Sequence, residues 1–437
     1  MKNKLFILLL LTLIISPVFA KDYDDDFYEE GGYEEAVPAS TSQPIRKNIR
    51  MPQPEKKENL LFPRLDGRIL TEYYINNLLK DKERISLDDK KTNGYLYTEL
   101  DFKLRFTKGI SLTSKWYLEP VDDRLYTGDI YAENPNYIIG NANNNDFYGK
   151  EDHIKRKFHF WDYGLGIETL NISYEASNIA LGIGKFNPSF GSAFEKSRFS
   201  GIYGTILPEE YELTEKIGGY ISALLPFGNI TFNLFFNDET DLSGTMFRKK
   251  GKNKAEGTVG NTNKLNNYSL TFNGNFETFK LNLGFRQQYN ESKNNIEEVK
   301  ETGYVAGLEY LIELDYNIVF KPLAELTYIT NYMSMENRKV LYGTLFLPIM
   351  FENWHLMFSG TIKYDKEKNY DRYNTYLAQI SFGYKFDIGL MIDFARIWGK
   401  QYYKADTFDN LGKDGEKWET QNNSWAFMIS YVYKFSI

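Results

Sequence analysis

The chain has 437 residues, of which 42% are hydrophobic and 16% aromatic, with no cysteine and a formal net charge of −7. The lack of cysteine excludes a disulfide scaffold and a thiolate metal site. After residue 20 no stretch approaches the ~20 consecutive apolar residues of a membrane-spanning helix. Because so many aromatic residues provide apolar surface to bury, disorder throughout is excluded as well. The composition indicates a large β-rich protein.

The first twenty residues predict export across the inner membrane. Lys2 and Lys4 precede an apolar run from Leu5 to Ile15, and Val18-Phe19-Ala20 ends it with small residues at the −3 and −1 positions. This pattern is typical of a cleaved signal peptide. A membrane anchor is the alternative, but the apolar run is about half of the ~20 residues that a span requires. We expect residues 1–20 to be removed.

Residues 21–60 form a separate region. The stretch KDYDDDFYEEGGYEE is strongly acidic, VPASTSQP is rich in turn-forming residues, and IRKNIRMPQPEKKEN is basic. None of the three has a helical or strand period. We expect a flexible periplasmic tail, with a plug or a cell-wall-binding segment as the alternatives.

From residue 61 onward, apolar and polar residues alternate in segments of nine to fifteen residues, separated by polar and glycine-rich clusters. In Tyr95–Phe106 the even positions carry leucine, threonine or phenylalanine, and the odd positions are polar or charged. A soluble sandwich would bury the apolar face, whereas a membrane barrel turns it toward lipid and the charges toward a wet lumen. The period alone fits both folds.

The connection lengths favour the barrel. Seven tight turns alternate with eight longer, more polar loops, which is typical of an outer-membrane barrel with both chain ends in the periplasm. We therefore predict an all-β fold, a transmembrane antiparallel β-barrel of about 16 strands (14–18), over residues 61–437. The expected strands are 64–77, 94–106, 110–119, 160–175, 179–187, 216–225, 229–237, 265–276, 278–290, 302–313, 316–331, 338–351, 353–366, 372–386, 388–400 and 423–437.

The last expected strand supports the barrel independently. From Trp425 to Ile437 seven large apolar residues occupy alternate positions, and in water such an edge would aggregate. The segment resembles the C-terminal insertion signal of barrel proteins, with Ile437 where phenylalanine is usual. In the expected strand 388–400, Arg396 falls at one of the alternate positions that face lipid. A charge there predicts a bulge or a shifted register near it.

The connection after the fifth expected strand carries the resemblance to a known family. Pro188-Ser189-Phe190-Gly191-Ser192 resembles the proline, acid, phenylalanine, glycine, glycine motif in the third outer loop of general porins, with serine in place of the acid and of one glycine. The string from Gly184 to Gly219 also resembles an uncharacterised group of porin-like proteins. This resemblance extends over residues 160–437. In sixteen-stranded porins the third loop folds into the lumen, so the resemblance implies an inward-folded loop at 188–215.

This loop is acidic, with a net charge of −3. Pro208 followed by acids predicts a short helix that begins there. The candidate constriction residues are Glu195, Glu209, Glu210, Glu212 and Glu215. On the pore wall, the basic residues with lumen parity that they would face are Arg68, Lys103, Arg105, Lys115, Lys280 and Arg286. Such a transverse field sets ion preference; the alternative is a solvated surface loop.

The sequence predicts an outer-membrane porin, a water-filled channel through which small hydrophilic solutes diffuse passively, with a weak preference for cations. The alternatives are an adhesin or structural barrel protein, and an oligosaccharide-selective channel to which Tyr97 and Tyr117 would contribute sugar contacts. No enzymatic activity is expected, because the three histidines lack a nucleophile motif. We expect no cofactor and no metal.

The expected partners follow from this interpretation. They are outer-membrane lipid and lipopolysaccharide, the barrel-assembly machinery and, for self-association, a homotrimer. Nucleic acid is not expected, because a chain with negative net charge repels a polyanion.

Overall fold

The computed structural model describes residues 62–78, 92–120, 163–198, 206–238, 264–289, 299–314, 318–366, 373–404 and 417–437. The predicted signal peptide (1–20) and tail (21–60) lie outside the described residues. Most of the predicted loops 120–159 and 238–264 also lies outside them, because residues 121–162 and 239–263 are not described.

The described residues form one antiparallel sheet of 18 segments. The segments are β1 (Arg64–Leu78), β2 (Thr92–Arg105), β3 (Ile110–Pro120), β4 (Tyr163–Glu175), β5 (Ile179–Phe186), β6 (Lys216–Leu225), β7 (Gly228–Asn237), β8 (Asn267–Asn275), β9 (Phe279–Tyr289), β10 (Lys300–Tyr310), β11 (Ile312–Leu314), β12 (Ile318–Phe320), β13 (Leu323–Thr330), β14 (Lys339–Phe351), β15 (Trp354–Lys366), β16 (Tyr373–Lys385), β17 (Leu390–Lys404) and β18 (Lys417–Ser436).

Two of these strands are interrupted rather than separate. Leu311 alone divides β10 from β11, and Lys321 and Pro322 divide β12 from β13. Because β10 pairs with β13 and β11 with β12, the 18 segments make 16 strands. The predicted strand number is confirmed, and β18 starts six residues before the expected position 423.

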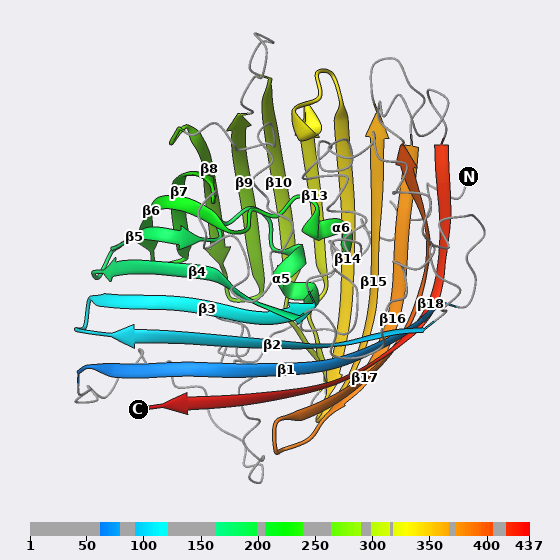
Figure 1. Ribbon diagram of the computed structural model, residues 1–437, viewed down its shortest axis with the longest axis horizontal. Helices are drawn as coiled ribbons and strands as arrows, with labels where there is room; N and C mark the ends of the chain where they lie inside the picture. The colour runs from blue at the N-terminus through cyan, green and yellow to red at the C-terminus, as the bar shows by residue number, and fades with distance from the viewer. Residues whose placement is uncertain are drawn as a thin grey trace.

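The sheet closes on itself. β1 pairs antiparallel with β2 on one side and with β18 on the other (Figure 1). At the seam, Leu65 and Ile437 exchange two backbone hydrogen bonds of 2.8 Å. Gly67 is required there, because a Cβ at this position would overlap the ring of Phe435. In the described part of the sheet, closure leaves no free strand edge.

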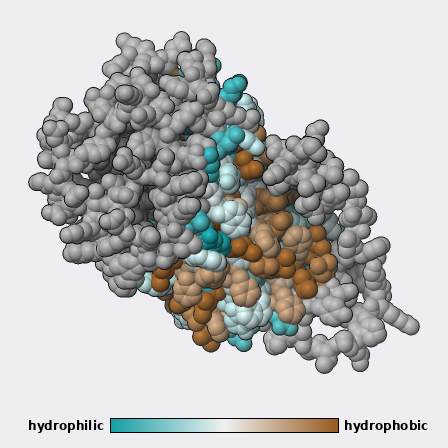
Figure 2. Space-filling model, turned by 90° about the vertical axis from the view of Figure 1, so that its right-hand side faces the viewer, coloured by the Kyte–Doolittle hydropathy of each residue, from teal (hydrophilic) through white to brown (hydrophobic). Residues whose placement is uncertain are grey.

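The apolar face of the strands points outward. Ile179, Leu181 and Ile183 of β5 are all exposed, and in β18 Trp425 and Tyr433 are exposed while Ala426 is buried. Figure 2 shows such apolar residues gathered on the outer surface that it presents. The predicted inversion, with apolar residues outside and polar ones inside, is the arrangement of a transmembrane barrel. In the described part of the chain, no helix is long and apolar enough to cross a membrane.

The expected irregularity near Arg396 is wrong. The register runs through Arg396 without a shift on both sides, and its guanidinium lies over the ring of Trp425 at 4.6 Å and bonds to Asn423. A cation on an aromatic face can keep an outward position. The register shift found in the described residues lies instead between Lys115 and Trp116, against β4.

Candidate functional site

Between β5 and β6 the chain turns into the barrel. We call residues 187–198 and 206–215 the inner segment; it contains α5 (Ala193–Arg198) and α6 (Ile206–Glu209). α5 lies against β13 and β14, and α6 lies against β14 and β15 (Figure 1). These strands are distant in the sequence from β5 and β6, which flank the inner segment. The inward-folded third loop is therefore confirmed. The predicted helix start at Pro208 is wrong: α6 begins at Ile206, and a turn follows it, in which Glu212 donates to the carbonyl of Glu209 at 3.1 Å.

The inner segment is fastened by an apolar cluster. Phe190, Tyr211 and Leu213 are each at most 3% exposed. Their partners on the barrel wall are Phe235, Val305, Ile329, Val340 and Tyr342. Burying side chains of this size stabilises the segment by about 1.5–3 kcal/mol each, so it is part of a packed interior.

Glycines on the wall provide the space for this packing. A Cβ at Gly303 would lie 3.0 Å from the ring of Phe190, and one at Gly307 would lie 3.3 Å from the hydroxyl of Ser192. Both glycines are on β10, whose other inward residues include Val305. The smooth surface of β10 thus lets the inner segment approach closely.

A buried carboxylate of the wall holds the start of α5. Glu325 of β13 is 2% exposed. It accepts hydrogen bonds from the backbone N–H groups of Ser192 (2.6 Å) and Ala193 (3.2 Å), from the hydroxyl of Ser192 (3.0 Å) and from the phenol of Tyr211 (2.7 Å). All four donors belong to the inner segment. Because a buried charge needs such donors, Glu325 and the inner segment depend on each other.

Arg286, predicted for the pore wall, is 3% exposed and lies beneath the inner segment. It donates to Glu301 at 2.8 Å and to the carbonyl of Tyr211, and its guanidinium lies 4.5 Å from the ring centre of Phe190. These contacts support the segment from the wall.

Two of the predicted constriction carboxylates form ion pairs with lysines that the sequence analysis did not select. Glu210 contacts Lys363 at 2.5 Å and accepts from the phenol of Tyr342 at 2.7 Å. Glu215 contacts Lys185 at 2.9 Å. Lys363 has the lumen parity of His355 on the same strand, a signal that could have found it. Lys185 has the parity of lipid-facing residues, and only the positive φ of Gly184 (136°) marks a local departure from the strand.

The other predicted constriction residues are more open. Glu195 and Glu209 are exposed, and Glu212 is half-buried. Glu195 and Glu209 are therefore the constriction candidates that meet solvent most directly, whereas one carboxylate oxygen of Glu212 is buried.

On the opposite wall, the predicted basic residues form ion pairs with wall carboxylates. Arg68 contacts Glu99 at 2.5 Å and also Asp101, and Lys115 contacts Glu99 at 3.1 Å. Further along the same strands, Lys103 contacts Glu175 at 3.0 Å and Arg105 contacts Asp66 at 3.6 Å. The wall from β1 to β4 therefore carries a network of both signs.

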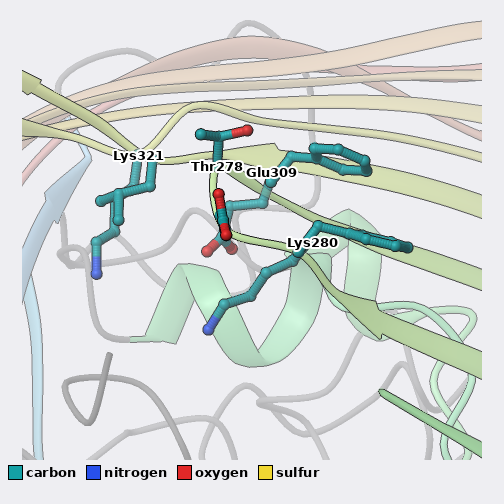
Figure 3. Close-up of a pocket in the computed structure, with 8 residues that line it drawn as sticks. Thr278, Lys280, Glu309 and Lys321 are labelled. Carbon is teal, nitrogen blue, oxygen red and sulfur yellow. The ribbon is translucent and has the colours of Figure 1, made fainter. Parts of the chain in front are cut away.

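Lys280 lies at the tight-turn end of the lumen. It is the cross-strand neighbour of Glu309, which forms an ion pair of 2.7 Å with Lys196 of α5. Figure 3 shows Lys280 and Lys321 on two sides of Glu309, around a small cavity that Thr278 also lines.

The candidate sugar-contacting tyrosines form hydrogen bonds within the protein. Tyr97 donates to Glu99 at 2.8 Å, and Tyr117, 5% exposed, donates to Glu215 at 3.4 Å. His355 lies 2.5 Å from Asp393 across Gly383 of the strand between them. Among the described residues, no group of three or more histidine, aspartate and glutamate side chains could hold a metal ion.

The described part of the chain thus forms a closed 16-stranded barrel with an inward-folded segment. The structure is similar to the outer membrane channel DcaP of Acinetobacter baumannii, with a TM-score of 0.53 and 11% identity over 85% of this chain and 98% of that chain. Salmonella typhi OmpF in complex with Daunomycin gives a TM-score of 0.49 and 10% identity, over 85% of this chain and 98% of that chain. No family model and no curated protein matches the sequence. At such identity, the likeness to DcaP shows the fold.

Proposed function

We propose that this chain is an outer-membrane porin, a water-filled channel through which small hydrophilic solutes diffuse passively. The observation that carries the proposal is the inner segment, which is fastened inside a closed barrel by Glu325, Arg286 and the apolar cluster. A segment held in this way narrows a lumen without needing to fill it. Many of the inward-facing residues of the surrounding wall are polar or charged, as a wet passage requires.

We further propose a weak preference for cations. The constriction would consist of Glu195, Glu209, Glu210, Glu212 and Glu215, opposite the wall residues Arg68, Lys103, Arg105 and Lys115. Lys280 and Arg286 do not face it across the lumen as expected, because Lys280 lies beside the Glu309–Lys196 pair of α5 and Arg286 lies beneath the inner segment. Glu210 and Glu215 contact lysines, whereas Glu195 and Glu209 are the exposed carboxylates of the inner segment and would act on passing ions most directly. A small excess of negative charge in a narrow pore raises the local concentration of cations.

The cellular setting belongs to the same proposal. Residues 1–20 would direct export and be cleaved, residues 21–60 would remain in the periplasm, and the barrel-assembly machinery would insert residues 61–437 into the outer membrane. The apolar outer surface would contact lipid and lipopolysaccharide. A homotrimer is the proposed oligomeric state.

Planar-bilayer recording with the refolded full chain tests the proposal. A porin gives stepwise increments of conductance. Under a salt gradient, the reversal potential should have the sign expected of a channel that prefers cations. An adhesin or structural barrel with a packed lumen gives a folded protein with no conductance, and that result would refute the porin assignment.

A further inference from the structure

The connection between β13 and β14 is strained. Asn331, Met333, Ser334 and Asn337 have φ values of 52°, 56°, 56° and 64°. These are four of the six non-glycine residues with positive φ in the described part of the chain. A Cβ makes this left-handed conformation unfavourable, most of all in a bulky residue such as Met333. Strain of this kind persists only where surrounding contacts hold it.

The contacts that hold it are made to the inner segment and its supports. Tyr332, in the short turn η3 (Tyr332–Ser334; the yellow turn between β13 and β14 in Figure 1), is 4% exposed and belongs to the same apolar cluster as Phe190 and Tyr211. Its phenol lies 3.5 Å from the carboxylate of Glu210. Through the side chain of Tyr332, the connection therefore contacts the inner segment.

A second contact reaches the other support of the inner segment. The backbone N–H of Met333 donates to Glu301 at 2.8 Å, and Glu301 also accepts from Arg286, which holds the carbonyl of Tyr211. The connection and the inner segment thus share two ion pairs: that of Glu210, in the inner segment, with Lys363 of the wall, and that of Glu301 with Arg286, both on the wall. Displacing either element weakens the contacts of the other.

The ring of Tyr332 is also held by two cations, Arg338 at the end of the connection and Lys363 of β15. Arg338 lies 5.1 Å and Lys363 5.3 Å from its ring centre, and Arg338 contacts Asp365 at 2.6 Å. Within the connection, the side chain of Asn331 bonds to the carbonyl of Lys300 at 2.9 Å and accepts from the N–H of Asn337 at 3.0 Å. These bonds fix the strained backbone in one conformation.

We propose that residues 331–338 are a latch that holds the inner segment in its constricting position, with Tyr332 as the positioning residue. The strain stored in the latch lowers the free-energy difference between the latched and released states, so the pore has a second state in which the inner segment is loosened. This inference rests on the proposed channel function for its effect on conductance. The latch itself is a structural coupling, and it can be measured without any current.

Hydrogen exchange followed by mass spectrometry provides that measurement. In the refolded full chain, Tyr332→Ala should speed exchange of peptides within residues 187–215 by about tenfold or more, which corresponds to about 1.4 kcal/mol of lost coupling. Tyr332→Phe retains the ring and loses only the contacts of the phenol with Glu210, at 3.5 Å, and with Tyr342, so it should exchange within about twofold of the wild type.

Substitutions at Ser334 test the strain without removing a contact of Tyr332. Valine is β-branched and disfavours positive φ, whereas glycine accepts it. Ser334→Val should therefore speed exchange in residues 187–215 and increase the frequency of conductance substates, while Ser334→Gly should lower both. The same two substitutions at exposed Ser177, in the tight turn between β4 and β5 and without positive φ, are the matched control and should change neither.

The outcomes separate the two proposals. If the wild type conducts but Tyr332→Ala and Ser334→Val both leave substates and exchange unchanged in a folded barrel, the latch is refuted and the porin stands. If the wild type does not conduct yet exchange responds as described, the porin is refuted and the latch stands. Equal responses of Ser334→Val and Ser334→Gly would also overturn the latch, because strain would then play no part.

Discussion

The phenol of Tyr211 donates a hydrogen bond of 2.7 Å to the carboxylate of Glu325, between residues 114 positions apart in the chain. Both side chains are almost fully buried. Burial raises the pKa of Tyr211 well above its usual value, with the negative charge of Glu325 adding to the effect. Tyr211 therefore stays protonated and remains a donor at physiological pH. The bond ties the inner segment to the wall at the point where α5 begins.

Removing the carboxylate should release the inner segment. Glu325→Ala leaves the N–H groups of Ser192 and Ala193 and the phenol of Tyr211 without their acceptor, and hydrogen bonds to a charged group contribute about 1.5–3 kcal/mol each. We expect larger and noisier single-channel conductance. Glu175→Gln, which alters an ion pair on the far wall, should keep the wild-type conductance. Equal conductance in the two variants would show that Glu325 does not position the segment.

A side chain at Gly303 should push the inner segment away from β10. A Cβ at this position would lie 3.0 Å from Phe190 and from Arg286. Gly303→Val should therefore overpack this contact and destabilise it by about 1–3 kcal/mol. The expected result is increased proteolysis of the inner segment in a barrel that stays folded. Gly360→Val is the control, because a Cβ there would have its nearest neighbour at 3.7 Å and should be tolerated.

The exposed and the paired carboxylates of the inner segment should respond differently to neutralisation. Glu195→Gln combined with Glu209→Gln should lower the cation preference and leave the conductance nearly unchanged, because both side chains are exposed. Glu210→Gln should also raise the frequency of substates, because it leaves Lys363 without its carboxylate partner. Reversal potentials and single-channel records measure the two effects. An unchanged reversal potential in the double variant would show that Glu195 and Glu209 do not line the pore.

The tight turns should face the periplasm. Single cysteines at Lys108, Phe227 and Asp387 should be protected from an impermeant maleimide in whole cells, whereas cysteines at Asn143 and Lys250, which lie outside the described residues, should be labelled. Phe227 is preferred to Gly228, whose φ of 144° would strain any substitution. Labelling at Phe227 without labelling at Asn143 would show the opposite orientation. Labelling of the same sites in spheroplasts confirms that each cysteine is reactive.

The strands and their outward and inward faces can be predicted from the amino-acid sequence alone. Alternation of period two and the lengths of the connections gave 16 strands and the outward face of residues such as Ile179 and Ile183. These features are local: each strand carries its own pattern, and a turn is defined by a few neighbouring residues. The inward course of residues 188–215 came from a motif, Pro188 to Ser192, that is also local. The irregularity predicted near Arg396 is wrong because the aromatic neighbour that supports its outward position, Trp425, lies on another strand and is not visible in the local pattern.

Which charges meet inside the barrel depends on the three-dimensional fold. Glu210 and Lys363 are 153 positions apart, and nothing in the alternation of either segment selects this partner over another inward cation. The positions of Glu325 under α5 and of Tyr332 over Glu210 likewise depend on how far the chain reaches across the lumen. Barrel closure fixes those distances, and closure is a property of all the strands together, so the contacts that position the inner segment could not be derived from the period of any one of them.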